Sequence, residues 1–151
     1  MNPPPKVLLL IGSESDRPIM EPGVAILREH GVEVEVAVSS AHRHPERTVN
    51  LASGARASGT DVIICGAGLS AALPGVAAAH TDLPVIGVPI AAGTLGGIDA
   101  LLSIAQMPPG VPVATVGINA AANAAYLALR ILRGGALLTA AADSDASSKA
   151  L

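Results

Sequence analysis

Apolar residues are gathered in five short runs along the chain, and segments with a helix-like pattern separate these runs. Runs rich in Val, Ile and Leu predict β-strands, and near-continuous apolar character is typical of strands buried on both faces. The predicted strands are Val7–Ile11, Val32–Val38, Asp61–Cys65, Val85–Val88 and Val113–Gly117. The predicted helices are Arg17–His30, Pro45–Ser58, Ala71–Ala79, Ile98–Met107 and Ala120–Arg133.

Residues that start and stop helices support this order of elements. Asp16 can cap a helix that has Pro18 in its early turn, and Gly31 stands where that helix would end. Pro45 fits the first turn of the next helix, and Gly59 follows its end. Strands that alternate with helices in this way imply right-handed crossovers and a parallel sheet covered on both faces. We therefore expect an α/β fold, a three-layer flavodoxin-like sandwich with a five-stranded parallel sheet.

The length of the chain, 151 residues, predicts one domain with a sizeable core. We assign residues 1–133 to a single α/β domain that carries any catalytic site, and residues 134–151 to a C-terminal tail. After Gly134-Gly135 the composition changes to Ala, Ser and Asp, so the tail is expected to be helical or disordered. An extra helical turn or two fits Ala136–Ala142, and the chain from Asp143 to Leu151 is expected to be frayed or disordered.

Composition and charge narrow the choice of partners. Half of the residues are hydrophobic and 14% are charged, and so little charge suggests that part of the surface is buried between subunits. The net charge of −3, with no basic run and no aromatic platform, argues against a nucleic-acid partner. The single Cys65 is interpreted as a buried core residue, compatible with a reducing compartment such as the cytoplasm. We expect a homo-oligomer.

The stretch from Ala100 to Leu129 has no charged residue, which superficially resembles a membrane span. Prolines on both sides of Gly110 interrupt it, and neither half offers about twenty continuous apolar residues. The N-terminal residues Met1 to Pro5 lack the basic start and apolar body of a signal peptide. We therefore expect a soluble, cytoplasmic protein with no membrane partner.

Small polar residues follow the first predicted strand, in the segment Gly12-Ser13-Glu14-Ser15-Asp16. Residues just past the carboxyl ends of parallel strands line the ligand crevice of an open sheet. Gly12 lets the backbone approach a ligand, and Ser13 and Ser15 offer hydroxyl donors. Asp16 can either cap the following helix or accept hydrogen bonds from sugar hydroxyls. The segment is no P-loop, because the Gly-Lys-Ser/Thr ending is missing.

The segment after the second strand, Ser40-Ala41-His42-Arg43, carries the groups best suited to chemistry. Arg43 can bind a phosphate through two parallel hydrogen bonds, with Ser40 as a neutral donor. The imidazole of His42 can both give and take a proton within a cycle. Such a pair near a helix start can also be a surface or capping pair, but the neighbouring loop after the first strand favours the functional interpretation. His44 is interpreted as solvent-exposed, with a second titrating group as the alternative.

Small residues also follow the third strand, from Gly66 to Gly75. Gly66 and Gly68 allow a flat ring to lie against the backbone, although Gly-x-Gly alone usually indicates a tight turn. As the third polar or flexible segment at a strand end, this one is interpreted as part of the site. The corresponding segments after the fourth and fifth strands, Gly93–Gly97 and Asn119–Asn123, are expected to be loops and helix caps.

Other kinds of site find little support in the sequence. No metal site is predicted, because the histidines are dispersed and there is a single cysteine. The Gly-x-Ser-x-Gly motif of a nucleophile elbow is missing. His30 and His80 are interpreted as structural or solvated.

The chain resembles the family of small purine-biosynthesis enzymes that contains N5-carboxyaminoimidazole ribonucleotide mutases and aminoimidazole ribonucleotide carboxylases. The resemblance covers most of the chain, from about Val7 to Leu132. Besides the three segments described above, it rests on five motifs in the same order: Leu73-Pro74-Gly75, Gly87-Val88-Pro89, Ser103-Ile104-Ala105-Gln106-Met107-Pro108, Gly110-Val111-Pro112-Val113 and Asn123-Ala124-Ala125.

The resemblance implies that a carboxylate moves from the exocyclic nitrogen to ring carbon C4 of the imidazole nucleotide, without a metal or organic cofactor. It implies that Ser13 and Asp16 hold the ribose, that Ser40 and Arg43 hold the phosphate, and that His42 is the catalytic acid and base. It further implies a homo-octamer, with a homotetramer as the alternative. The other residues expected to bind the nucleotide are Gly12, Ser15, Ala41, Ala67, Gly68, Ser70, Ala72 and Leu73.

Several positions depart from the family pattern. Mutases usually carry His in place of Ala72, whereas the carboxylase branch has a small residue there, with a Ser like Ser70 two positions earlier. Carboxylases, however, usually have Lys in place of Arg43, and the segment Gln106-Met107-Pro108 is mutase-like. His44 stands where Thr is usual. Mutase activity is therefore predicted. The alternatives are a carboxylase using free carbon dioxide, a related carboxylase for another aromatic mononucleotide, and a non-enzymatic nucleotide-binding module.

Overall fold

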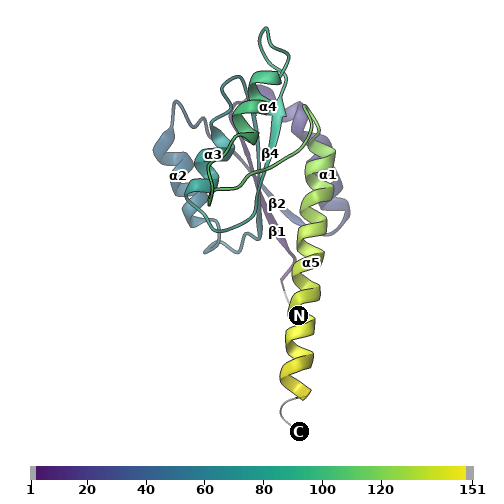
Figure 1. The fold of residues 1–151 in the computed structure, drawn as a ribbon. Helices are drawn as coiled ribbons and strands as arrows, with labels where there is room; N and C mark the ends of the chain where they lie inside the picture. The colour runs from purple at the N-terminus through teal and green to yellow at the C-terminus, as the bar shows by residue number, and fades with distance from the viewer. Residues whose placement is uncertain (1–2, 149–151) are drawn as a thin grey trace.

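The computed structural model describes the backbone of residues 3–148 and the side chains of residues 3–135. Parallel strands form one sheet in the order β2-β1-β3-β4-β5 (Figure 1). The strands are β1 (Lys6–Ile11), β2 (Glu33–Val38), β3 (Val62–Gly68), β4 (Val85–Ile90) and β5 (Ala114–Thr115). This is the strand order of flavodoxin-like sheets, so the predicted fold is confirmed.

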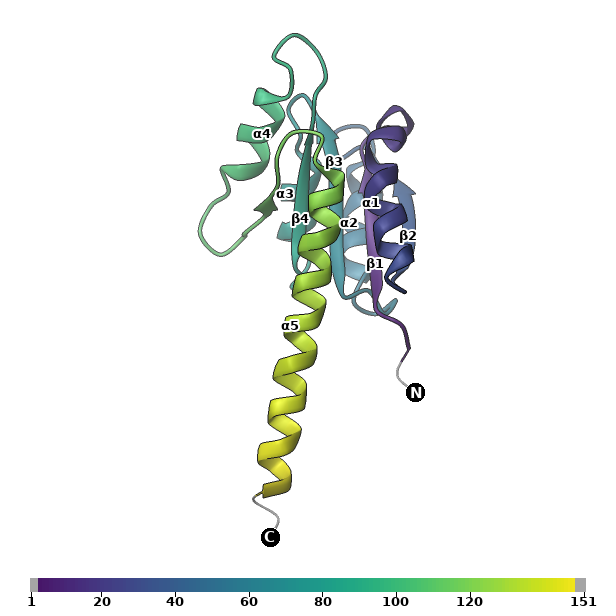
Figure 2. The same cartoon turned by 90° about the vertical axis from the view of Figure 1, so that its right-hand side faces the viewer.

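Helices cover both faces of the sheet and complete the three layers (Figure 2). One face carries α1 (Arg17–Glu29) and α5 (Ala121–Ser148), and a 3-10 turn over Glu14–Asp16 leads into α1. The other face carries α2 (Pro45–Gly54), α3 (Leu73–Ala79) and α4 (Ile98–Ala105).

The alternation of side chains along β1 divides the apolar core into two parts. Val7, Leu9 and Ile11 pack with residues of α1 and α5, whereas Leu8 and Leu10 pack with residues of α2, α3 and α4. All five side chains are buried, and burying each contributes about 1.5–3 kcal/mol. A sheet held on both faces in this way is a rigid base for the loops at its carboxyl edge.

All five strands differ from their predicted boundaries by one or more residues, and β3 and β5 differ most. β3 continues through Gly66–Gly68, a segment that the sequence prediction placed after the strand, and pairs there with the end of β4. A Cβ at Gly66 would lie 2.7 Å from Sδ of Met20 and 3.2 Å from Cδ1 of Ile90, so these side chains would have to shift to admit it. β5 is shorter than the predicted Val113–Gly117, since this edge strand pairs with β4 only at Ala114 and Thr115.

Helix α5 continues without a break to Ser148. Of the two alternatives for the tail, helical or disordered, the structure therefore shows the helix up to that residue. The part from Asp143 to Ser148, which was expected to be frayed or disordered, is helical as well. Residues 149–151 lie outside the described residues, and the domain boundary at residue 133 stays a prediction. None of the helices among the described residues has both the length and the apolar character that crossing a bilayer requires.

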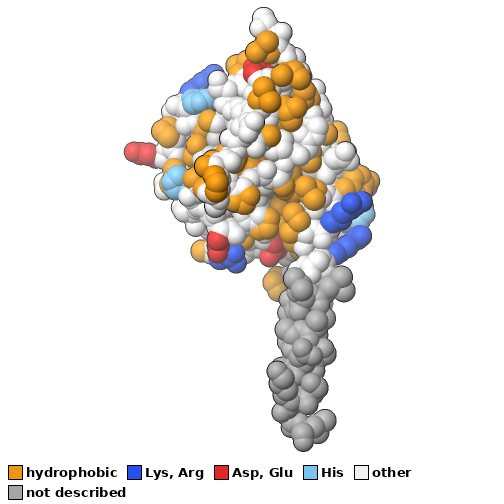
Figure 3. All heavy atoms as spheres, in the orientation of Figure 1, with side chains coloured by type: hydrophobic (Ala, Val, Ile, Leu, Met, Phe, Trp, Pro, Cys, Tyr) orange, Lys and Arg blue, Asp and Glu red, His pale blue; other side chains and the backbone are white. Residues whose placement is uncertain are grey.

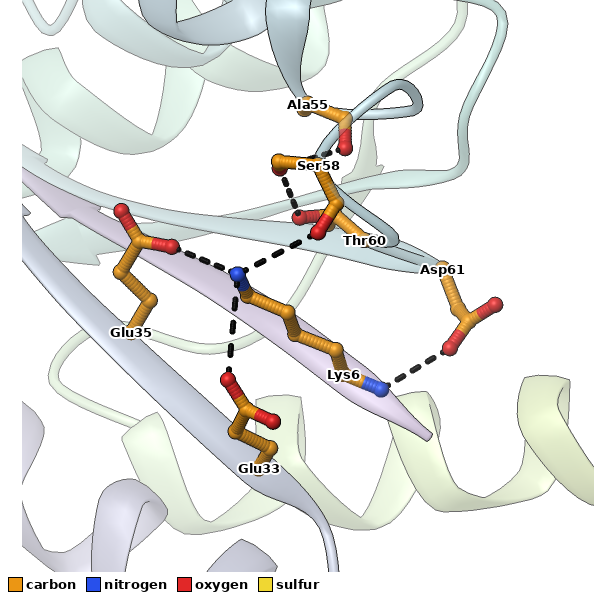
Figure 4. A network of polar contacts seen from close by, with 7 residues as sticks. All are labelled: Lys6, Glu33, Glu35, Ala55, Ser58, Thr60 and Asp61. Atoms are coloured by element: carbon orange, nitrogen blue, oxygen red, sulfur yellow. Dashed lines mark hydrogen bonds and ion pairs between the residues drawn. The ribbon is translucent and has the colours of Figure 1, made fainter. Parts of the chain in front are cut away.

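A polar network joins the amino ends of three neighbouring strands, β2, β1 and β3 (Figure 4). Nζ of Lys6 on β1 lies 2.8 Å from the carboxylate of Glu35 and 3.8 Å from that of Glu33, both on β2. The same Nζ donates to the carbonyl of Ser58, and the Lys6 N–H donates to the carboxylate of Asp61 before β3. These contacts connect β2, β1 and β3 at the edge of the sheet opposite to the candidate site.

Candidate functional site

A cleft of about 390 Å³ lies at the carboxyl ends of β1, β2 and β3. This is the switch point of the sheet, where β1 lies between β2 and β3 and where ligands of open parallel sheets bind. All of the predicted site residues line this main cleft: Gly12, Ser13, Ser15, Asp16, Ser40, Ala41, His42, Arg43, Ala67, Gly68, Ser70, Ala72 and Leu73. The structure thus brings together segments that are far apart in the sequence.

The loop after β1 forms the first wall of the main cleft. The Ser13 N–H donates to Oδ2 of Asp16 at 3.2 Å, and the Ser15 hydroxyl donates to the Ser13 hydroxyl at 2.9 Å. The N–H of Gly12 donates to the carbonyl of Gly66 at 3.1 Å and holds the loop against β3. Two hydroxyls and a carboxylate therefore lie together at this wall.

Asp16 occupies the N-cap position of α1, but its side chain makes no capping bond to that helix. The carboxylate turns back and accepts from Ser13, so capping of α1, one of the two roles predicted for Asp16, is wrong. Burial raises the pKa of Asp16, and the hydrogen bond from Ser13 acts in the opposite direction. Oδ1 of Asp16 makes no hydrogen bond to any residue that the structure describes, so it can accept one from a ligand hydroxyl.

The loop between β2 and α2 forms the second wall. The Arg43 N–H donates to the Ser40 hydroxyl at 3.2 Å, and the His44 N–H donates to the Ser40 carbonyl at 2.8 Å. Within the described part of the chain, the side chains of His42 and Arg43 have no hydrogen bond or ion pair. Both are exposed at the cleft, and the N-cap of α2 is His44 rather than either of them. This geometry favours ligand binding over a capping pair.

The end of β3 and the start of α3 form the third wall. Ala67 and Gly68 close the strand, and Leu69 follows with a φ of 53°. A left-handed conformation is uncommon for a residue with a side chain, and here it turns the chain sharply toward α3. Ser70 is exposed. Ala72 is half-buried and offers only a methyl group, at the position where the sequence analysis noted that mutases usually carry a histidine.

Three further residues line the main cleft, and the sequence prediction did not assign them to it: Leu69, Ala71 and Ala92. Ala92 follows β4, so its position at the carboxyl edge was the signal that could have identified it. The loop and cap roles expected after β4 and β5 are confirmed at two positions. Gly97 is the N-cap of α4, and Oδ1 of Asn119 accepts from the Ala91 N–H at 2.9 Å.

The main cleft combines a permanent cation with a proton-transfer group and several neutral donors. Arg43 can bind a phosphate, while the hydroxyls of Ser13 and Ser40 and the carboxylate of Asp16 can bind sugar hydroxyls and phosphate oxygens. His42 can move a proton to or from a ring held between these groups. The size of the cleft is within the range for small-molecule sites. The arrangement suits a phosphorylated sugar that carries a flat ring.

A larger hollow of about 610 Å³ lies near the amino ends of the strands. Its lining is mostly apolar and includes Val32, Val62, Leu129 and Leu132. We assign the chemistry to the smaller main cleft, because it gathers the imidazole, the guanidinium and the hydroxyls. Among the described residues, no three side chains of His, Cys, Asp or Glu come together as metal ligands do.

The comparisons with known proteins agree with this geometry. The family model described as AIR carboxylase matches residues 6–144. The chain is 56% identical to an N5-carboxyaminoimidazole ribonucleotide mutase of Pyrococcus abyssi and 55% identical to one of Mycobacterium tuberculosis, in each case over 85% of this chain and 74% of the relative. The crystal structure of Treponema denticola PurE has a TM-score of 0.77 with 29% identity, covering 95% of this chain and 93% of that chain. The chain belongs to the AIR carboxylase family.

Proposed function

We propose that this protein is an N5-carboxyaminoimidazole ribonucleotide mutase. It would move the carboxylate from N5 to C4 and give 4-carboxy-5-aminoimidazole ribonucleotide for purine biosynthesis. Curated relatives with this name share 52–56% of their residues with the chain over most of its length. The observation that carries the proposal is the meeting of His42 and Arg43 with the Ser13–Asp16 loop in one cleft.

The groups on the cleft walls suggest an orientation for the nucleotide. The guanidinium of Arg43 and the hydroxyl of Ser40 hold the phosphate, because both are donors and the first carries a positive charge. Asp16 accepts hydrogen bonds from the ribose hydroxyls, and Ser13 supports it from the same loop. The imidazole ring of the substrate then extends between His42 and the third wall, where Ala67 and Gly68 leave room for a flat ring.

His42 serves as acid and then as base in a reaction that is balanced overall. The protonated His42 gives its proton to the exocyclic nitrogen as the bond between this nitrogen and the carboxylate carbon breaks and carbon dioxide is released. Ring carbon C4 then forms a bond to the carbon dioxide, and the neutral His42 removes the proton of C4. A positioned proton-transfer group contributes about 10²–10⁴-fold to such steps. Holding the carbon dioxide beside the ring supplies a high effective concentration.

Ala72 supports a second candidate, a carboxylase that takes free carbon dioxide. The relatives include a phosphoribosylaminoimidazole carboxylase of Candida albicans, 53% identical over 85% of this chain but over only 22% of its own length. A wall that ends in the methyl group of Ala72 lacks the imidazole expected of mutases. The mutases favour the first candidate, because this chain matches 74% of their length but only 22% of the length of the carboxylase.

Two substrates separate the candidates. The purified protein receives either the N5-carboxylated nucleotide or aminoimidazole ribonucleotide with bicarbonate, at low enzyme concentration, and the C4 carboxylate is measured. A mutase forms it from the first substrate, and a carboxylase forms it from the second. His42→Asn is the matched variant and should lose the activity while it keeps its affinity for the product nucleotide. Turnover of neither substrate by the wild type would refute both candidates.

Exposed apolar side chains support an oligomer, which we propose to be a homo-octamer, with a homotetramer as the alternative. Leu95, Ile98 and Leu102 are 60%, 53% and 55% exposed on α4 and the loop before it. Figure 3 shows apolar side chains gathered over this end of the molecule, with few charges among them. Burial against another copy would remove this area from water. Light scattering gives the subunit number.

We also propose that the protein is located in the cytoplasm. A role in nucleotide synthesis and the free thiol of Cys65 are both compatible with this reducing compartment.

A further inference from the structure

A second cleft of about 360 Å³ adjoins the main cleft. The two share Gly12, Ser13, Ser40 and Arg43 in their linings, so Arg43 stands at the boundary between them. The second cleft adds residues that the sequence analysis did not single out, above all Arg47 in the first turn of α2. It therefore extends the site away from His42 and toward the end of β2.

The side chain of Arg47 is held in place by the backbone of the sheet. Its Nε–H donates to the carbonyl of Val38, the last residue of β2, at 3.1 Å. This is the only hydrogen bond of that side chain to the residues that the structure describes, so its terminal amino groups can still donate. A guanidinium that is fixed at one nitrogen loses less freedom when it binds an anion with the others.

The charge balance of the second cleft is positive, although the whole chain has a formal net charge of −3. Arg43 and Arg47 are the permanent cations that line it, and Glu14 is the carboxylate. The Arg17 guanidinium binds Glu14 through Nε and, at 3.1 Å, through Nη2, and this pairing lowers the pKa of Glu14. The negative charge of Glu14 is thus matched outside the cleft, and the two arginines have no acidic partner within it.

We propose that Arg47 is a second phosphate-binding residue and that the nucleotide phosphate sits in the second cleft between Arg43 and Arg47. This inference rests on the proposed function. A phosphate dianion has three terminal oxygens, and one planar guanidinium binds two of them. A second guanidinium binds the remaining oxygen and matches the second negative charge. With the phosphate in the second cleft, the main cleft is left to the ribose and the ring beside His42.

Calorimetric titration of two ligands tests this assignment. The ligands are 4-carboxy-5-aminoimidazole ribonucleotide and the nucleoside that lacks its phosphate. Arg47→Gln should weaken nucleotide binding on the order of 10-fold and leave nucleoside binding unchanged, because only the nucleotide carries the phosphate. Arg47→Lys, which keeps the charge without the planar fork, should fall between this variant and the wild type. The loss should shrink as salt is added.

The control is Arg56→Gln, because Arg56 is also an exposed arginine and pairs with Asp82 outside both clefts. It should bind both ligands as the wild type does. If the Arg47–Val38 bond has only a structural role, Arg47→Gln should bind both ligands more weakly, and that result overturns the proposal. Unchanged nucleotide binding in Arg47→Gln also overturns it. If the wild type binds neither ligand, the proposed function itself is wrong and this inference falls with it.

Discussion

The hydroxyl of Ser103 donates a hydrogen bond of 2.7 Å to the carbonyl of Ser70. This bond joins α4 to the third wall of the main cleft, across a sequence separation of 33 residues. Ser70 stands one residue after Leu69, whose left-handed backbone is disfavoured for a leucine. A contact from a neighbouring helix can hold this loop in its turned conformation, so we expect Ser103 to position the third wall.

Removing that hydroxyl should affect the loop more than the fold. In Ser103→Ala the loss of one exposed hydrogen bond should lower the free energy of unfolding by no more than about 1 kcal/mol. The value of kcat/KM should fall about 5-fold, because the third wall is no longer held at the nucleotide ring. Ser103→Thr keeps the hydroxyl and should restore the wild-type value. Kinetics that stay unchanged in Ser103→Ala would show that the loop holds its shape without α4.

Gly12 and Gly87 differ in the space that the surrounding chain leaves for a side chain. A Cβ at Gly12 would meet only ordinary contacts, 3.8 Å from Oδ2 of Asp16 and 3.9 Å from the Gly66 carbonyl. A Cβ at Gly87 would lie 2.3 Å from Cγ2 of Ile104. The chain itself therefore requires glycine at position 87 but not at position 12, where the open side faces the main cleft.

Two variants follow from this contrast. Gly87→Ala should lose about 1–3 kcal/mol of unfolding free energy through overpacking. Gly12→Ala should unfold as the wild type does, yet its KM for the nucleotide should rise at least about 10-fold, since the new methyl group takes the place of the ligand. Denaturant unfolding and steady-state kinetics measure the two effects. An unchanged KM in Gly12→Ala would place the nucleotide away from the loop after β1.

The strands and the main cleft show which parts of the structure could be predicted from the sequence and which could not. The apolar runs predicted the strands. The polar or flexible segments after three of these strands predicted most of the main cleft, because parallel strands end at one edge, but Leu69, Ala71 and Ala92 were missed. The segment from Gly66 was placed after the third strand rather than within it, since glycine is depleted in strands. The reason for a glycine at position 66 lies elsewhere in the chain, because a Cβ there would crowd the side chains of Met20 and Ile90. Arg47 was missed for a similar reason, because its bond to Val38 appears only after folding.

Asp16 links stability to pH in a direction opposite to that of an ion-paired carboxylate. Burial raises its pKa above the ordinary value of 3.8, so the folded protein binds this proton more tightly than the unfolded chain does. The stabilising contribution is complete below pH 3.8 and is lost as the pH rises through the folded pKa. At neutral pH the charged carboxylate therefore lowers stability, and its retention suits a role in binding the ribose.

In Asp16→Asn the difference from the wild type should consequently depend on pH. The variant should be at least as stable as the wild type at pH 7, and this advantage should vanish near pH 3, where the wild-type carboxyl is neutral as well. Its affinity for the product nucleotide should fall on the order of 10-fold, because an amide accepts hydrogen bonds from hydroxyls less strongly than a carboxylate does. Unfolding curves at both pH values and calorimetric titration test this. A variant that is less stable at pH 7 would mean that the Ser13 bond outweighs burial.

Ala72 allows the missing imidazole to be restored. We infer that the hydroxyl of Ser70 functionally replaces the imidazole that mutases usually carry at position 72, since both residues line the same wall. Ala72→His introduces a group that titrates near neutrality beside the proposed ring site. The pH profile of kcat should then gain a second ionisation between about pH 5 and 8, and turnover of the N5-carboxylated nucleotide should rise.

Ala72→Gln is the matched control for this variant, because it adds a polar side chain without an ionisable group. It should keep the wild-type pH profile, so that a new ionisation in Ala72→His can be assigned to the imidazole itself. If Ala72→His and the wild type share one profile and one turnover number, position 72 is passive. The carbon dioxide would then be held by His42 and the other cleft walls, and Ala72 would not indicate whether the carbon dioxide comes from the substrate or from solution.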